Sequence, residues 1–257
     1  MLSDMTLETH AENGLVRVYL NRDHGNAIND DLVADLTATF RRLDNDDSVR
    51  GVLLGARGKL FSPGLDLQEL VPLDRSQMER FLERFNACIM ALYTFSKPMV
   101  AALHGHAVAG GCVLALTADW RVLHEEKLIG LNEVRVGVPF PFGVSMLLRE
   151  SVPQRHLTEI ALFGNNHRGE DAVRVGLVHE THGSDGFEEH AMERLQTLAD
   201  KDAGAFAVTK RYLRSATVER ILSDEARLAV DFIDRWFSPS TRAKVEAIVE
   251  ELNKKKG

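Results

Sequence analysis

The stretches FSPGLDL at residues 61–67 and HGHAVAGGCV at residues 104–113 decide the fold of this chain. Both contain glycines, which allow the backbone to come within hydrogen-bonding distance of a ligand. Backbone N–H groups fixed in this way stabilise an oxyanion that develops during a reaction. The two stretches together therefore predict a split oxyanion hole to which each contributes one donor.

The composition is that of an ordinary globular protein. The chain has 257 residues, of which 44% are hydrophobic and 27% charged, so it can bury a sizeable core and disorder is not expected. Its formal net charge is −7 at pH 7. Phosphate recognition needs clustered basic residues, so this charge argues against a nucleic-acid partner.

The cysteines and the N-terminal segment bear on the cellular setting. Cys88 and Cys112 have no CxxC spacing and lie in apolar surroundings, which predicts small core residues. The N-terminal segment is acidic and contains no basic stretch followed by an apolar one, so we expect neither a signal nor a transit peptide. No apolar run approaches the length of a membrane span. The expected setting is the cytoplasm, without a membrane partner.

Hydrophobic periodicity predicts strands and helices in alternation. We expect strands at 15–20, 51–55, 99–103, 119–123 and 128–129, a loop at 21–26, and helices at 28–43, 76–95 and 112–118, with Gly110 at a helix N-terminus. After about residue 202 only helices are predicted, including 218–237 and 240–253. The pattern indicates an α/β core over residues 1–200 and a helical region over residues 201–257.

A family resemblance rests on the two glycine stretches, Lys97-Pro98, Asp119 and EDAVRVGLV at residues 170–178. Together they resemble the crotonase (enoyl-CoA hydratase/isomerase) superfamily through most of the chain. The resemblance implies a right-handed spiral of β-β-α turns, followed by helices that assemble homotrimers or dimers of trimers. It also implies an acyl-CoA thioester substrate, with coenzyme A entering as part of the substrate and no separate cofactor.

The same resemblance assigns roles to residues of the two stretches. The Leu65 and Gly110 N–H groups would polarise the thioester carbonyl so that an enolate can form beside it. The segment that would cradle the pantetheine and adenine portions of coenzyme A consists of Pro63, Gly64, Leu65, Asp66 and Leu67. Asp66 has a second interpretation, since it could cap the next short helix.

The acidic residues favour one reaction of the family. Its hydratases use two glutamates, and the position of the first is Val113 here, which cannot activate water or deliver a proton. The second is retained as Glu133, in a run IGLNE at residues 129–133 that resembles Δ3,Δ2-enoyl-CoA isomerases. One carboxylate suits a proton shuttle, so we expect an isomerase with Glu133 as base in an apolar pocket that raises its pKa. Asn132 would position the acyl chain or the glutamate.

Other functions fit the same residues. A one-base hydratase, a decarboxylase and a thioester hydrolase are alternatives within the family, and a non-catalytic acyl-CoA-binding protein is an alternative outside enzymes. Acyl-chain length is not predicted, although FPFG at residues 140–143 places bulk near the acyl pocket.

Several polar residues near the motifs have a structural and a functional interpretation. His104 and His106 fit structural roles better than metal binding, because no third ligand has a suitable spacing, and no metal site is expected. His106 could also face the pocket. Arg22, His24 and Lys59 could contact the phosphates of the coenzyme or be solvated charges.

Overall fold

Two parallel-stranded layers form the centre of the molecule. The computed structural model describes residues 6–254. A six-stranded sheet has the order β1 (Leu7–Glu12), β2 (Leu15–Leu20), β3 (Gly51–Ala56), β5 (Met99–Leu103), β7 (Trp120–His124) and β9 (Glu180–His182). A three-stranded sheet has the order β4 (Leu60–Ser62), β6 (His106–Val108) and β8 (Ile129–Gly130).

The order of the strands describes a spiral. The chain passes from β3 to β4, from β5 to β6 and from β7 to β8, so each turn adds one strand to each sheet. All pairs are parallel except β1 with β2. Every residue of β3 is buried, as expected for a parallel strand covered on both faces. The predicted α/β spiral of β-β-α turns is confirmed.

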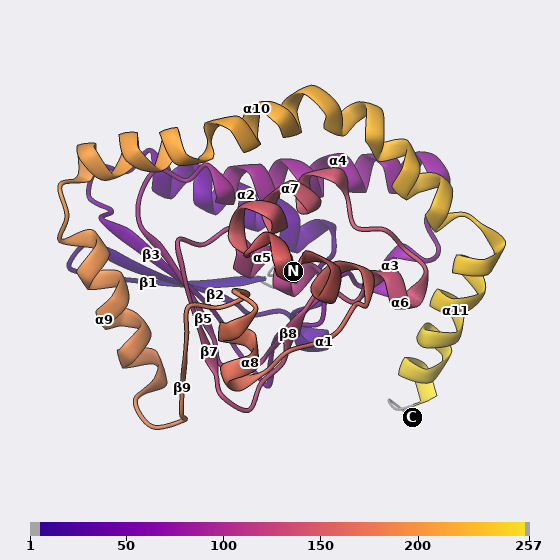
Figure 1. Ribbon diagram of the computed structural model, residues 1–257, viewed down its shortest axis with the longest axis horizontal. Coiled ribbons are helices and arrows are strands. Elements are labelled where there is room, and N and C mark those ends of the chain that lie inside the picture. Colours follow the sequence, from indigo (N-terminus) through magenta and orange to yellow (C-terminus); the bar gives the residue numbers. More distant parts are fainter. Residues whose placement is uncertain (1–5, 255–257) are drawn as a thin grey trace, which may run out of the picture.

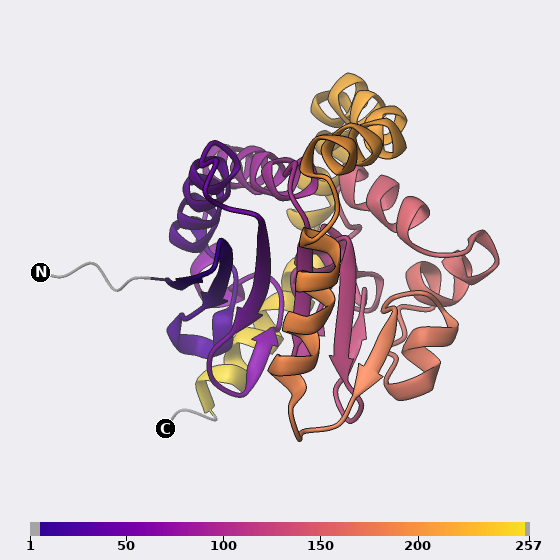
Figure 2. The same ribbon diagram turned by 90° about the vertical axis from the view of Figure 1, so that its left-hand side faces the viewer.

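Helices cover the spiral on several sides. The longer ones are α2 (Asp30–Asp44), α4 (Arg75–Tyr93), α7 (Phe142–Ser151), α9 (Phe187–Ala199), α10 (Ala203–Trp236) and α11 (Pro239–Lys254). Short helices are α1 (Asp23–Asn26), α3 (Leu67–Leu70), α5 (Gly110–Leu116), α6 (Glu133–Val136) and α8 (Gly169–Arg174), and the turns Gln154–His156 and Thr158–Leu162 are 3₁₀ and π-helical. Figure 1 shows α10 running along α4, whereas α9 lies on the larger sheet (Figure 2).

Three segments differ from the sequence-based expectation. The region 218–237 is not a separate helix, because α10 continues through 34 residues in which Gly204 is the only glycine and no proline occurs. The expected loop 21–26 contains the helical turn α1, with positive φ at His24, Gly25 and Asn26. Helix α2 begins at Asp30 because the Asn29 side chain caps it by accepting from the Leu32 N–H at 3.0 Å.

Buried charges fasten α10 to the spiral. One Asp119 carboxylate oxygen accepts from Lys210 Nζ at 2.7 Å and from the Met99 N–H at 2.8 Å, and the other accepts from Arg214 at 2.7 Å. Lys210 is buried, and burial lowers its pKa to about 8. This network sets the position of α10 along its first three turns.

One hydrophobic core joins the spiral and the C-terminal helices. It contains strand residues such as Leu54 and Leu103 together with Phe232 and Trp236 of α10 and Val245 of α11. The residues of both predicted parts pack into this core. The division of the chain into a spiral core at residues 1–200 and a helical region at residues 201–257 stays a prediction. Both cysteines are buried free thiols, as predicted. Among residues 6–254, no helix is long and apolar enough to cross a membrane, and the cytoplasmic location stays a prediction.

Candidate active site

The segment around Leu65 leaves one backbone donor unused. Leu65 forms a parallel bridge with Ile28, in which the Ile28 N–H donates to the Gly64 carbonyl and the Asp66 N–H donates to the Ile28 carbonyl, both at 2.8 Å. In a parallel bridge of this type the N–H of the central residue points to the opposite side. Within the described residues, the Leu65 N–H has no hydrogen-bond acceptor.

Gly64 brings the two glycine stretches into contact. Its φ is +100°, and a Cβ there would lie 2.9 Å from the Ala109 Cβ and 3.1 Å from the Gly110 nitrogen. An L side chain would meet both a rare backbone conformation and a clash. Glycine at position 64 therefore allows the Leu65 segment to lie against the start of α5.

The start of α5 presents a second free donor. Gly110 is its first residue, as predicted, so its N–H lies at the positive end of the helix. Ala109 precedes it at φ 50° and ψ −124°, a strained conformation for a residue other than glycine, and its N–H donates to the Gly130 carbonyl at 2.8 Å. No acceptor for the Gly110 N–H is found in the part of the chain that the structure describes.

These donors border a cavity of about 240 Å³. Of the predicted site residues, it brings together Pro63, Leu65, Leu67, Gly110, Asn132 and Glu133. The other lining residues are apolar and come from α4, α5 and the residue before it, α6, the segment between α6 and α7, α10 and α11: Leu82, Phe85, Ala109, Val113, Val136, Val138, Phe140, Pro141, Phe232, Trp236, Val245 and Ile248. The predicted bulk at residues 140–143 thus lies partly in the cavity wall.

Glu133 is an acid in this apolar cavity. It is the first residue of α6, and its Oε2 atom is buried without a hydrogen-bond partner among the described residues. Burial raises the pKa of Glu133 to about 7, because the charged form loses its hydration. Val113, the position at which the hydratases of the family have their first glutamate, lines the same cavity. The expected apolar surroundings of Glu133 are found.

Gly64 and Asp66 do not line the cavity. Asp66 caps α3 by accepting from the N–H groups of Gln68 and Glu69, so its capping role is confirmed. Its carboxylate also pairs with Arg22 at 2.7 Å. The proposed contributions of Gly64 and Asp66 to substrate binding stay predictions.

The candidate phosphate contacts have different surroundings. Arg22 is mostly buried and binds Asp66 and Glu69, so it is not a solvated charge. His24 Nδ1 lies 3.7 Å from Asp66, and Lys59 is exposed. His104 Nε2 contacts the Gly58 carbonyl at 2.9 Å, and His106 Nδ1 accepts from the Leu128 N–H at 2.9 Å. Burial lowers the pKa of His106. Both histidines bind backbone groups outside the cavity lining, in agreement with structural roles.

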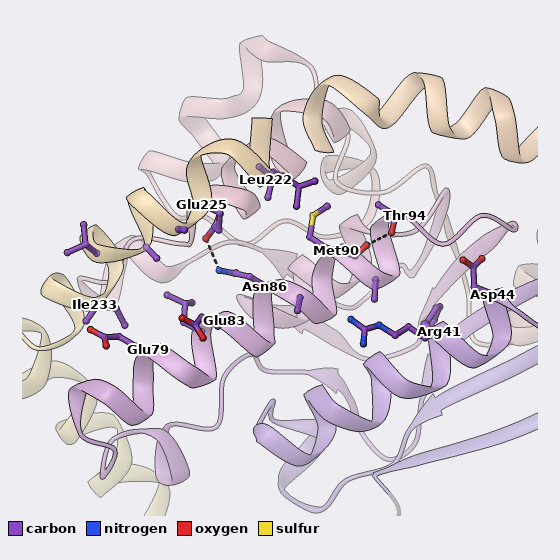
Figure 3. A pocket seen from close by; sticks show the side chains of 18 residues that line it. Arg41, Asp44, Glu79, Glu83, Asn86, Met90, Thr94, Leu222, Glu225 and Ile233 are labelled. Atoms are coloured by element: carbon purple, nitrogen blue, oxygen red, sulfur yellow. Dashed lines mark hydrogen bonds between the residues drawn. The ribbon is translucent and has the colours of Figure 1, made fainter. Parts of the chain in front are cut away.

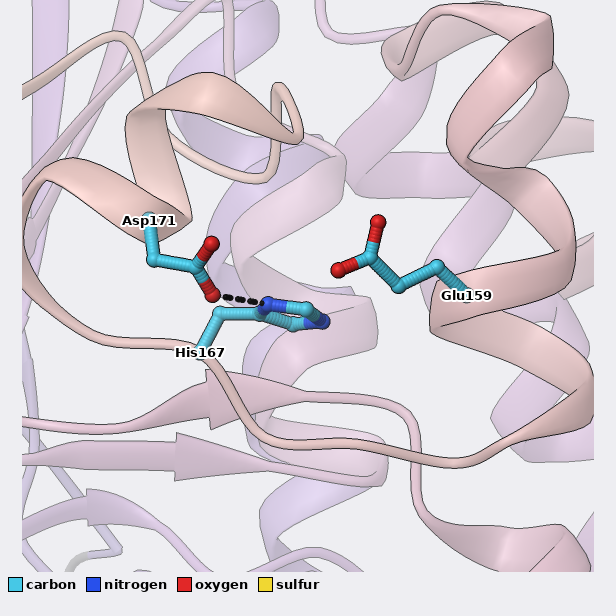
Figure 4. Close-up of side chains that lie close together, drawn as sticks. All are labelled: Glu159, His167 and Asp171. Atoms are coloured by element: carbon cyan, nitrogen blue, oxygen red, sulfur yellow. Dashed lines mark hydrogen bonds and ion pairs between the residues drawn. The ribbon is translucent and has the colours of Figure 1, made fainter.

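A separate cluster joins Glu159, His167 and Asp171 (Figure 4). Atoms of these residues that could ligate a metal lie within 4.8 Å of one another, and no sequence motif predicts the group. His167 Nδ1 pairs with Asp171 at 2.6 Å, and Arg174 binds Asp171 at 2.6 Å and Glu159 at 2.8 Å. Arg174 thus supplies a positive charge to both carboxylates, and the cluster serves as an ion-pair network between α8 and the π-helical turn.

Part of the cavity wall is not predicted by the motifs. Leu82 and Phe85 on α4, and Phe232 and Trp236 on α10, are far from the glycine stretches in the sequence. Their only signal is helical apolar periodicity, which does not distinguish a core face from a cavity wall.

The spiral and this cavity, with two free backbone donors and one buried carboxylate, define a protein of the crotonase class. The model of the enoyl-CoA hydratase/isomerase family matches residues 10–254, and the chain belongs to this family.

Its relatives carry different reactions in their names. The mitochondrial enoyl-CoA delta isomerase 1 of Mus musculus is 26% identical over 98% of this chain and 88% of its own length. The (E)-benzylidenesuccinyl-CoA hydratase of Thauera aromatica is 30% identical over 83% of this chain and 82% of its own. The crystal structure of human mitochondrial delta3-delta2-enoyl-CoA isomerase superposes with a TM-score of 0.93 at 24% identity, covering 98% of this chain and all of the other. That likeness shows the fold.

Proposed function

We propose that this protein is an acyl-CoA isomerase that moves the double bond of a 3-enoyl-CoA to the 2-trans position. The observation that carries the proposal is the carboxylate of Glu133, the only one among the described residues that line this mostly apolar cavity, with its Oε2 atom buried and without a hydrogen-bond partner there. Its pKa of about 7 makes both the base and its conjugate acid accessible near neutral pH.

The reaction would use Glu133 twice. The ionised carboxylate removes a proton from C2 of the 3-enoyl thioester, and the electrons move onto the thioester oxygen to give a dienolate. The Leu65 and Gly110 N–H groups stabilise the oxygen charge. The protonated carboxyl group then returns the proton at C4, so that base and acid are the same side chain. Asn132, which also lines the cavity, would orient the acyl chain or the glutamate.

Val113 favours isomerisation over hydration. A two-carboxylate mechanism would need an acid at this position, and a valine can neither activate water nor transfer a proton. Membership of the family does not distinguish the two reactions, because one relative is named an isomerase and another a hydratase.

An assay with two substrates tests the proposal. Purified protein is incubated with 3-hexenoyl-CoA and, separately, with 2-hexenoyl-CoA, while the double bond and any 3-hydroxyacyl-CoA are followed by absorbance and mass. We expect conversion of the 3-enoyl thioester without hydration. Glu133→Gln should abolish turnover and retain acyl-CoA binding, because the amide cannot accept the proton. Hydration of the 2-enoyl substrate, or turnover by the variant, would contradict the assignment.

The helix α10 would also carry an assembly surface. Tyr212, Leu213 and Leu222 are each about 70% exposed along it, an unusual density of large apolar side chains for a solvated helix. We propose that α10, through such exposed apolar residues, associates with further copies of the chain as a homotrimer, singly or as a dimer of trimers.

A further inference from the structure

A second cavity, of about 750 Å³, lies between α4 and α10 (Figure 3). Its walls include apolar residues of both helices, and Glu79, Glu83 and Glu225 add acidic groups. Glu79 and Glu83 are exposed, whereas Glu225 is half-buried and points from α10 toward Asn86 of α4 (Figure 3). Among these three acids of α4 and α10, Glu225 is the one that binds residues close in sequence to the lining of the cavity that contains Glu133.

The Glu225 carboxylate binds two other elements. Its Oε1 accepts from the Asn86 side-chain amide at 2.7 Å, and its Oε2 accepts from the Gly143 N–H at 2.5 Å. Gly143 is in the first turn of α7, where the positive end of the helix favours a carboxylate. A Cβ at position 143 would lie 3.0 Å from this carboxylate oxygen, so glycine allows the contact. The carboxylate therefore joins α4, α7 and α10.

These elements also form the wall of the cavity that contains Glu133. Phe140 and Pro141 come directly before α7, and their position depends on where α7 begins. Phe85 precedes Asn86 on α4, and Phe232 lies two turns after Glu225 on α10. One part-buried set of hydrogen bonds, centred on Glu225, thus joins the three elements that form this apolar wall.

We infer that Glu225 is a positioning residue that sets the acyl-chain preference of the active site by holding the Phe140-Pro141 wall against α4 and α10. This inference rests on the proposed acyl-CoA site. Glu225 does not touch the cavity, so it acts through the wall and takes no part in proton transfer. A wall held in place limits the space for the acyl chain, and one that is released accepts longer chains.

Removing the charge tests this role. In Glu225→Gln, the side-chain amide N–H group faces either the Asn86 amide or the Gly143 N–H. Both of these groups are donors, so one of the two hydrogen bonds is lost. We measure the dissociation constants of butyryl-CoA and dodecanoyl-CoA by calorimetry, since neither saturated thioester can isomerise. The ratio of the dodecanoyl to the butyryl constant should fall about tenfold, because only the longer chain has to displace the wall, and the hydrogen bond to a charged group that resists this displacement is lost. Glu83→Gln, in the same groove, should leave the ratio unchanged.

A second substitution separates positioning from loss of stability. In the double variant Glu225→Gln with Asn86→Asp, the glutamine oxygen can accept from Gly143 while its amide donates to the carboxylate on α4. This double variant should restore the wild-type ratio, whereas Asn86→Ala alone should shift it in the same direction as Glu225→Gln. A partly unfolded variant would lower the amount of active protein for both ligands and leave the ratio intact.

The two proposals can fail separately. If Glu225→Gln and Asn86→Ala are folded by circular dichroism and keep the wild-type ratio, the positioning role is wrong even when the isomerase assay succeeds. If the ratio shifts and is restored by the double variant while no 3-enoyl-CoA is turned over, the isomerase assignment is wrong and the positioning role stands.

Discussion

Glu133 shows how burial gives one carboxyl group two chemical states. Few polar groups surround it, and its pKa of about 7 follows from the lost hydration of the charged form. An ordinary surface glutamate would be fully ionised near neutral pH and a poor proton donor. The cavity thus makes a common residue suitable for giving back the proton that it removed.

The pH dependence of the isomerase activity follows from this pKa. We expect kcat/KM for 3-hexenoyl-CoA to rise with pH through an apparent pKa of about 7 and to level off above it, because the free enzyme must present ionised Glu133. A pH series of initial rates measures this. An apparent pKa near that of a solvated glutamate would show that Glu133 is not the titrating base.

The contribution of Glu133 to the free energy of unfolding should fall as pH rises, whereas the activity increases. The folded pKa of Glu133 lies above the 4.5 of an unperturbed glutamate, so folding favours its protonated form. Wild-type stability relative to Glu133→Gln should therefore fall between about pH 4.5 and 7, by up to about 3 kcal/mol, and stay low at higher pH. Urea unfolding of both proteins across this range measures the difference. A constant difference would contradict the burial of the ionised group.

Gly64→Ala tests the contact between the two donor segments. The added methyl group would lie 2.9 Å from the Ala109 Cβ and 3.1 Å from the Gly110 nitrogen, so the two N–H groups must move apart. We expect kcat to fall about 100-fold, as for a misplaced oxyanion donor. Gly58→Ala is the matched control, because Gly58 also has positive φ, but no atom of a non-neighbouring residue within 6–254 lies within 4 Å of its Cβ position. Equal losses in both variants would point to backbone strain alone.

At the scale of the element, α10 is held by charges as well as by apolar packing. Asp119 lies at the start of β7 and binds Lys210 and Arg214, which are one helical turn apart on α10. These ion pairs connect α10 to the start of β7, the strand that follows α5 in the chain. The position of Trp236 in the cavity wall therefore depends on interactions made at the opposite end of its helix.

Asp119→Ala should destabilise the protein strongly. It leaves the buried Lys210 without its partner, and we expect a loss of about 3–5 kcal/mol in the free energy of unfolding, measured in urea. The control is Asp234→Ala, which removes the exposed ion pair with Arg75 and should cost less than about 1 kcal/mol. Comparable losses in the two variants would mean that the network contributes no more than a surface pair.

For the whole molecule, the exposed apolar residues of α10 predict self-association. The chain has a mass of 28.6 kDa, and light scattering should give about three or six times this value. Leu222 is 71% exposed, and Leu222→Arg should shift the mass toward that of the monomer, because a charge would be buried in the interface. Leu162→Arg, at a residue 70% exposed near the π-helical turn, is the control. A wild-type monomer would contradict the proposal.

Much of this fold was predictable because its signals are local. The apolar run of β3 and the helical periodicity over residues 28–43 act over a few residues, so the sequence indicates this strand and the body of α2 directly, whereas the cap at Asn29 that sets the start of α2 was not predicted. The continuity of α10 was not predicted, since periodicity alone gives no reason to join 203–217 to 218–237. Asp66 caps α3 through local backbone contacts, as one of its two interpretations predicted, but its pair with Arg22, far away in the sequence, was not predicted.

The amino-acid sequence by itself determined the two glycine segments, the presence of Glu133 and the absence of an acid at Val113. These features follow from local sterics and from side-chain identity, which do not depend on distant residues. Only the tertiary structure decided that α4, α10 and α11 close an apolar cavity around Glu133, and that Glu225 holds its wall from behind. Burial and the pKa that it produces depend on residues brought together from more than a hundred positions away in the chain, and local patterns do not encode which faces will meet.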